Sequence, residues 1–320
     1  MQQYVVKRLL LFVPTLLLVS IIIFVLLRVI PGDPALAILM GDQGDAGQFT
    51  QEEYDAVRHE LGTDRPIVVQ FTTWIWDLLR GEFGESMWYG QPVWDELKEK
   101  FPTTLELVVL ALIIGFVVAV PVGIISAVRQ DTWVDYAARV FAIAGTALPN
   151  WWLGIISIYL LLRLVGWVPP VVYDKLWENP WNNLQQLILP AIVLGYYNMA
   201  LVARVTRSSM LDVLREDYIR TAYSKGLREK VVIIRHALKN AFLPVLTISG
   251  WQIGVLLGGT VLVEQVFTVP GVGLSLWEGF FHRDFTMIQG IVFLVAGGVL
   301  LLNLFIDITY GWLDPRIRFT

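Results

Sequence analysis

The chain has 320 residues, of which 56% are hydrophobic and 16% charged, with a mean hydropathy of +0.60 and a formal net charge of −4 at pH 7. This composition lies outside the usual range of soluble proteins and within that of polytopic membrane proteins. The absence of Cys excludes disulfides, thiolate nucleophiles and Cys-ligated metals, and three widely spaced His form no plausible metal cluster. We therefore expect no catalytic, cofactor-binding or metal site in this chain.

Six apolar segments are long enough to cross a bilayer core of roughly 30 Å as helices. The first follows two cations but exceeds the roughly 7 to 15 apolar residues of a signal peptide, so we expect a span rather than a cleaved leader. The third is interrupted by "LPNWW", and the fourth opens near Pro190. The predicted spans are residues 9–27, 107–127, 140–162, 187–203, 241–263 and 287–306.

The segment between the first two spans carries 14 Asp and Glu against 5 Lys and Arg, a net charge of −9. It contains helix-like stretches, "TQEEYDAVRHELG" and "IVVQFTTWIWDLLRG", so we expect a small folded insert rather than a linker. The predicted division is a first transmembrane helix at 1–30, the insert at 31–100 and a core of five spans at 101–320.

The placement of Lys and Arg predicts the orientation. If the N-terminus is cytoplasmic, the inner side holds 15 of the 24 cations, nine of them between Arg204 and Lys239. The outer side holds nine, five of which lie in the long insert, where the positive-inside rule has little weight. We expect both termini in the cytoplasm of a prokaryotic cell, and the protein in its inner membrane.

The loop that joins the fourth and fifth spans, residues 204–240, is the most informative segment. It holds nine cations, four acids and one His. Apolar residues recur at Ile219, Ala222, Tyr223 and Leu227, a helical spacing that gives an otherwise solvated segment one apolar face. Gly226 then predicts the end of a short helix or a sharp turn.

Three interpretations of this loop compete. A basic helix beside the membrane would be attracted to anionic lipid headgroups. A docking helix for a cytoplasmic partner better explains a short helix, a glycine turn and a second helix. Nucleic-acid binding is disfavoured, because acids are mixed with the cations and no aromatic stacking platform accompanies them.

Two features of the spans add further candidates. Gly250, Gly254 and Gly258 remove side chains from one helix face, which allows close packing either within the chain or at a pathway or partner surface, and Gln252 beside them is a candidate pathway residue. Asp307 shares a helix face with Asn303. This Asp is either a proton-relay carboxylate or, more simply, the partner of an interfacial Arg.

Seven motifs occur in an order that identifies a resemblance covering nearly the whole chain. They are "RVIPGDPA", "LGTDRPIVVQF", "LLRGEFGES", "FPTTLEL", "YIRTAYSKGL" with "RHALKNAFLPV", "VEQVFTVPGVG" and "NLFIDITYGWLDPRIR". Together they resemble the permease subunits of ABC importers, in the version carried by the dipeptide/oligopeptide group. The resemblance implies an all-α membrane protein with six transmembrane helices of the type I importer kind.

The resemblance also implies roles for individual residues. Arg220, Thr221, Ala222 and Gly226 occupy the family's Glu-Ala-Ala and Gly positions, although the first two depart from the general pattern. The ATPase-coupling loop would comprise Tyr218, Ile219, Arg220, Thr221, Ala222, Tyr223, Lys225 and Gly226. The Pro270–Gly271 turn would belong to the outer gate, although a plain surface loop is equally compatible with its sequence.

No G-x-x-x-x-G-K-[ST] motif occurs in the sequence, so the chain has no P-loop for ATP. The resemblance supplies the partners: two ATPase subunits that bind ATP and Mg, a second permease of similar fold, and an extracytoplasmic substrate-binding protein. Ile219, Ala222 and Tyr223 would pack into a groove on an ATPase subunit, and closure of the two ATPases would tilt the spans to give alternating access.

Alternatives remain open at this point. A self-sufficient secondary transporter or channel would use Asp307 or Glu264 for ion coupling and would need no docking helix. An intramembrane enzyme is more remote, because the spans contain no catalytic motif. Di- or oligopeptides are the favoured substrates, with nickel complexes, glutathione and oligosaccharides as alternatives that the sequence does not distinguish.

Overall fold

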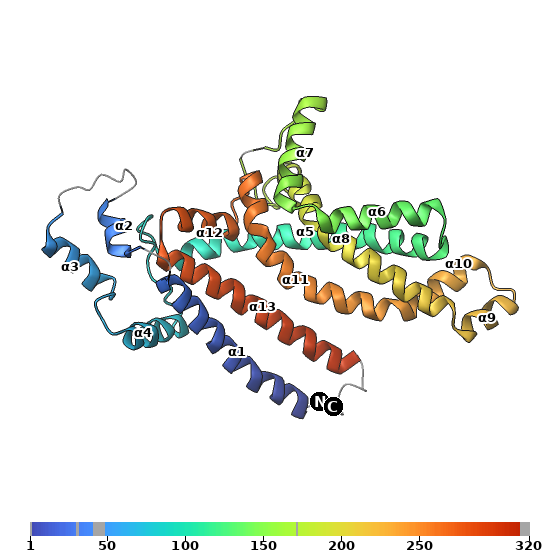
Figure 1. Ribbon diagram of the computed structural model, residues 1–320, viewed down its shortest axis with the longest axis horizontal. Helices are drawn as coiled ribbons and strands as arrows, with labels where there is room; N and C mark the ends of the chain where they lie inside the picture. The colour runs from blue at the N-terminus through green and yellow to red at the C-terminus, as the bar shows by residue number, and fades with distance from the viewer. Residues whose placement is uncertain (1, 30–31, 41–48, 171, 314–320) are drawn as a thin grey trace. The chain divides into compact units, whose positions relative to one another are not determined.

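The computed structural model describes residues 2–29, 32–40, 49–170 and 172–313, and all regular elements within these ranges are helices (Figure 1). This result confirms the predicted all-α fold class. The elements are α1 (Gln2–Val29), α2 (Pro34–Met40), α3 (Gln51–Glu60), α4 (Ile67–Leu79), α5 (Val93–Val128), α6 (Trp133–Ala147), α7 (Asn150–Val165), α8 (Pro180–Leu214), α9 (Asp217–Ser224), α10 (Glu229–Val231), η1 (Val232–Leu238), α11 (Lys239–Phe267), α12 (Val272–Phe281) and α13 (Phe285–Leu313).

Five of the six predicted spans lie in helices that are long and apolar enough to cross a membrane, namely α1, α5, α8, α13 and the continuous helix formed by α10, η1 and α11. The predicted span at 140–162 differs. It consists of α6 and α7, which are bent by 108° at a short break. The predicted interruption at "LPNWW" is therefore confirmed, as a break between two helices.

The break follows from one proline. Leu148 is extended, with φ −95° and ψ 131°, as expected for a residue that precedes a proline, and its N–H still bonds the Ala144 carbonyl at the end of α6. Pro149 then precedes the first turn of α7 with φ −65°, where its missing N–H costs nothing. The predicted span is thus built from two helices of 15 and 16 residues.

The described part of the chain divides into two compact units, unit 1 with residues 1–103 and 270–320 and unit 2 with residues 104–269. In unit 1, α1 packs along α13, and Ile23 and Leu27 meet Ile288 there, with Trp74 of the insert against them. The helix-like stretches of the insert are confirmed as α3 and α4. The division of the chain into 1–30, 31–100 and 101–320 stays a prediction.

Asp284 ties a loop of the insert to the beginning of α13. This carboxylate is 1% exposed and accepts hydrogen bonds from the Ser86 hydroxyl and from the backbone N–H groups of Trp88 and Met287. The last of these bonds caps the first turn of α13. One buried acid therefore organises two segments almost 200 residues apart in sequence.

In unit 2, the long helix α8 is the central element, and α6, α7 and α11 pack against it. Glycines make the closest approaches possible. A Cβ atom at Gly195 of α8 would lie 2.6 Å from the Ala111 carbonyl oxygen of α5, and one at Gly123 of α5 would lie 2.6 Å from Cβ of Thr206. These positions exclude any larger side chain without movement of a backbone.

Candidate functional site

Helix α9 and the turn after it form a closed local structure. The N–H of Leu227 bonds the Ala222 carbonyl at 3.4 Å, and the N–H of Gly226 bonds the Tyr223 carbonyl at 2.9 Å, which together make a Schellman motif. Gly226 has φ +74°, the left-handed conformation that glycine adopts without strain. The prediction that Gly226 ends a short helix is confirmed.

One face of α9 is buried in the chain's own structure. Ile219 is 1% exposed and Ala222 is also buried. They belong to a core cluster formed with residues from the ends of four neighbouring elements, Ala127, Met210, Val232, Ala237 and Ala241. Ile219 and Ala222 therefore cannot enter a groove on another subunit, and their predicted role as docking residues was wrong: the apolar periodicity indicated a face, but the face packs inward.

The remaining predicted residues of α9 are exposed. Tyr223 is 45% exposed and the Arg220 side chain 76%, and Thr221 and Lys225 are also exposed. Tyr218 is exposed as well, and its hydroxyl accepts a hydrogen bond of 2.7 Å from the Asn240 amide of α11. The structure thus brings the remaining predicted residues of the loop onto one solvent-facing surface.

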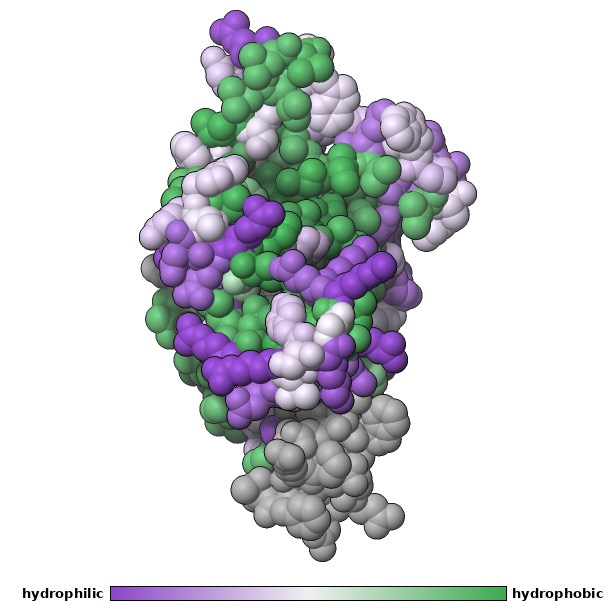
Figure 2. Space-filling view, turned by 90° about the vertical axis from the view of Figure 1, so that its right-hand side faces the viewer, coloured by the Kyte–Doolittle hydropathy of each residue, from purple (hydrophilic) through white to green (hydrophobic). Residues whose placement is uncertain are grey.

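The segment after Gly226 extends this surface. Leu227, Val231 and Ile234 are exposed apolar residues, and exposed cations of the same segment include Arg228 and Lys230. Figure 2 looks onto the end of unit 2 that carries α9 and α10 and shows hydrophilic side chains interleaved with hydrophobic ones there. We call the exposed residues of 217–234 the coupling face.

A π-helix, η1, connects this face to α11. It spans seven residues, Val232–Leu238, of which Val232 and Ala237 are buried in the cluster beneath α9. Segments of π-helix are rare and often occur at functional sites. The sequence carried no signal for it.

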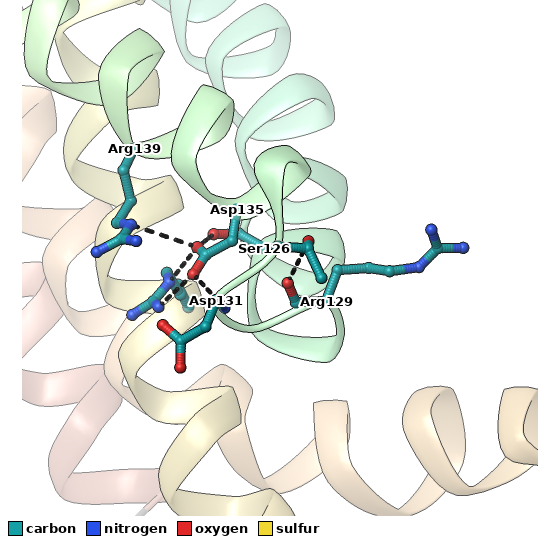
Figure 3. A network of polar contacts seen from close by, with 7 residues as sticks. Ser126, Arg129, Asp131, Asp135 and Arg139 are labelled. Carbon is teal, nitrogen blue, oxygen red and sulfur yellow. Dashed lines mark hydrogen bonds and ion pairs between the residues drawn. The ribbon is translucent and has the colours of Figure 1, made fainter.

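A buried ion-pair network that was not predicted from the sequence lies beside the coupling face (Figure 3). Asp135 of α6 is fully buried, and its two carboxylate oxygens accept hydrogen bonds of 2.8 Å each from Nε and Nη2 of Arg207 on α8. The Ser126 hydroxyl and the Asp131 N–H also donate to this carboxylate, and Arg139 lies 3.6 Å away. The network joins α5, the turn after it, α6 and α8. An acid at the edge of an apolar segment was the available signal, because such a charge requires a partner.

The chain matches the family described as "Binding-protein-dependent transport system inner membrane component" over residues 119–319, and the N-terminal part of such membrane components over residues 1–108. The chain belongs to this family of permeases. Two relatives are named dipeptide transport system permease protein DppB: one from Alkalihalophilus pseudofirmus is 38% identical over all of both chains, and one from Escherichia coli is 39% identical over 99% of each. The resemblance to the dipeptide group is confirmed.

A crystal structure of an amino acid ABC transporter with histidines aligns with a TM-score of 0.46 and 17% identity, over 66% of this permease and 92% of that chain. This likeness is too low to support a conclusion. The family membership, by contrast, disfavours the self-sufficient transporter or channel and the intramembrane enzyme.

The predicted glycine row of α11 has a different environment from the glycines that pack α5 against α8. Gly258 is exposed, and a Cβ atom there would meet nothing within 4 Å. Gly250 and Gly254 are partly exposed. At Gly258 the interpretation of close packing within the permease was therefore wrong, and a surface at the pathway or at a partner permease remains the prediction for the row.

Gln252 does not lie on an open surface. It is fully buried within the chain, and neither of its side-chain polar atoms has a hydrogen-bond partner there. The turn predicted for the outer gate leads directly into α12, with Gly271 as the extended residue before its first turn and Pro270 partly buried. The gating role of this turn and the pathway role of Gln252 stay predictions.

Of the two carboxylates considered for ion coupling, Glu264 of α11 is fully buried and accepts a 2.7 Å hydrogen bond from the Thr104 hydroxyl of α5. This bond ties two helices of unit 2 together. Asp307 lies in α13, and its side chain lies outside the part of the chain that the structure describes.

Proposed function

We propose that this permease is a transmembrane subunit of an ATP-driven importer of di- or oligopeptides, which it couples to ATP hydrolysis through the coupling face. The observation that carries the proposal is the two-sided construction of α9. Ile219 and Ala222 are buried and anchor the helix, whereas Tyr223, Arg220 and Lys225 are exposed in the described structure. A short helix anchored in this way transmits a push or pull to α5, α8 and α11.

The partners follow from this construction and from the family. ATP and Mg bind to two ATPase subunits, and the exposed cations of the coupling face pair with acids on them, with Tyr223 and Leu227 as the apolar contacts. A second permease of similar fold completes the pathway, with the glycine row of α11 as a candidate contact. An extracytoplasmic binding protein delivers the substrate, and both termini of the permease face the cytoplasm. The names of the relatives, dipeptide transport system permease proteins, support peptides as the substrate class.

The test is co-purification of the tagged permease with its ATPases in mild detergent, comparing wild type with Gly226→Arg. A Cβ atom at Gly226 would meet nothing within 4 Å, so the new side chain begins in open space at the exposed end of α9. The left-handed backbone adds a strain of about 1 to 2 kcal/mol.

Gly166→Arg is the matched control. Gly166 has φ +70°, caps the end of α7 and is equally open, so it suffers the same backbone strain away from the coupling face. We expect Gly226→Arg to lose the ATPase and its hydrolysis activity and Gly166→Arg to keep both. Retention of the ATPase by both variants would contradict the proposal.

A further inference from the structure

A cavity of about 450 Å³ lies in unit 2 beside the Asp135 network, between α5, α6 and α8. Part of its wall is apolar or lacks side chains, with Gly123, Ala142 and Ile143 among its residues. Three arginines complete the wall: Arg139 of α6 and Arg204 and Arg207 of α8. Such a combination of small apolar residues and guanidinium groups is suited to an anion that carries an apolar tail.

Among the described residues, acids do not fully neutralise the charge of this cavity. Asp135 is the acid that contacts its arginines, and it is already engaged in two hydrogen bonds with Arg207. Three arginines and this one acid leave a charge of +2, or +1 if the neighbouring Asp131 is included. The cavity therefore favours an anion.

Arg139 supplies unused hydrogen-bond donors. Its Nε and Nη2 atoms are buried and have no hydrogen-bond partner, since Asp135 lies 3.6 Å from Nε, beyond hydrogen-bond distance. Arg204 forms no ion pair in the described structure and is exposed on α8 three residues before Arg207. A buried donor without a partner is costly, and an anion in the cavity would satisfy it.

The predicted spans place the cavity near the level of the lipid headgroups. The second and fourth of these spans end at residues 127 and 203, so Ser126 lies at the end of one span and Ser208 lies five residues beyond the end of the other, about 8 Å along the helix at 1.5 Å per residue. The headgroup layer extends roughly 5 to 8 Å beyond the hydrocarbon core on each side of the bilayer. A phosphate at this depth would be reached from the membrane.

The outer face of α6 provides a surface for acyl chains. Trp133 at its beginning is 79% exposed, and Tyr136, Val140 and Ile143 follow on the same helix with more than half of their surface exposed. Aromatic residues at a helix end and aliphatic residues beyond it are typical of a helix that faces lipid. Because Ile143 also lines the cavity, the apolar face of α6 continues into it.

We propose that this cavity binds the phosphate group of an anionic phospholipid, with Arg139 and Arg204 as its ligands and the acyl chains along α6. Arg207 is held by Asp135 and serves to position the other groups. Bound on the same side of the membrane as α9, the lipid would brace the ends of α5, α6 and α8 on which the coupling face is mounted.

The test measures phospholipid retention by the purified, assembled transporter. After washing in detergent, native mass spectrometry compares retained phosphatidylglycerol in wild type, in Arg139→Gln with Arg204→Gln, and in Arg129→Gln. Arg129 is the control because it is exposed in the turn between α5 and α6 but points away from Asp135 (Figure 3). Removal of two cations is expected to weaken binding on the order of 30-fold, and removal of Arg129 to leave it unchanged.

The melting temperature of the same complexes identifies the source of the phosphate group. We expect phosphatidylglycerol in detergent micelles to raise the melting temperature of wild type and of Arg129→Gln but not that of the double variant. Phosphatidylcholine, or inorganic phosphate at millimolar concentration, should change the melting temperature little. Stabilisation by inorganic phosphate alone would make the occupant a soluble anion and overturn the lipid assignment. Equal lipid retention by the double variant and the control would overturn the site. Co-purified ATPase in the double variant shows that the permease is still folded.

Discussion

The difference in burial between Ile219 and Tyr223 of α9 predicts different effects when each is replaced by alanine. Ile219 is 1% exposed within a cluster of small and medium-sized residues, so Ile219→Ala leaves a cavity that costs about 2 to 5 kcal/mol. Tyr223 is 45% exposed, and Tyr223→Ala is expected to change stability by less than about 0.5 kcal/mol while it removes an aromatic contact for the ATPase.

Amide hydrogen exchange of the purified permease in detergent measures the difference locally. A loss of 2 kcal/mol in the free energy of opening corresponds to about 30-fold faster exchange of the α9 amides in Ile219→Ala. Tyr223→Ala should exchange within about 2-fold of wild type and yet retain less ATPase in co-purification. Unchanged exchange in Ile219→Ala, or loss of ATPase only in that variant, would refute the reasoning.

Three further predictions concern buried carboxylates. Asp135→Asn leaves Arg207 without its counter-charge and should lower the stability of the fold by about 3 kcal/mol. The variant should therefore aggregate at a lower temperature than wild type, and adding Arg207→Gln should restore part of the difference. Glu264→Gln keeps an oxygen that accepts from Thr104, so ATP-driven uptake in proteoliposomes should be retained, whereas abolished uptake would restore an ion-coupling role. Asp284→Ala removes the cap of α13 at a cost of about 0.5 to 2 kcal/mol and should speed proteolysis of the insert, while Asp284→Asn, which keeps an acceptor, should be milder.

Hydrophobic length predicted most of the spans, because a bilayer of fixed thickness demands helices of a minimum length. At residues 140–162 the sequence predicted an interruption but not the size of the bend, because the apolar character continues through Leu148 and Pro149 although the helix does not. A proline within a span is compatible with either a kink or a break, and the packing of neighbouring helices decides between them.

The sequence predicted a short helix with an apolar face at residues 217–226, but not the partner against which that face packs. The positions of Ile219 and Ala222 gave an apolar face, but a single sequence does not tell whether such a face meets another subunit or the chain itself. Asp135 was overlooked because its partner, Arg207, is 72 residues away and is brought near only by the packing of α6 on α8. The π-helix has no pattern of its own in the sequence.

The central claim, that the exposed side of α9 is covered by an ATPase subunit, is tested most directly by cysteine labelling, for which a chain without Cys is well suited. Thr221→Cys places a thiol on the coupling face, and Arg163→Cys places one on the exposed end of α7 as a control. Both are treated with a maleimide in the purified permease and in the assembled transporter. The account predicts that assembly protects only the thiol at position 221, whereas equal labelling at position 221 in the permease and in the transporter would contradict it.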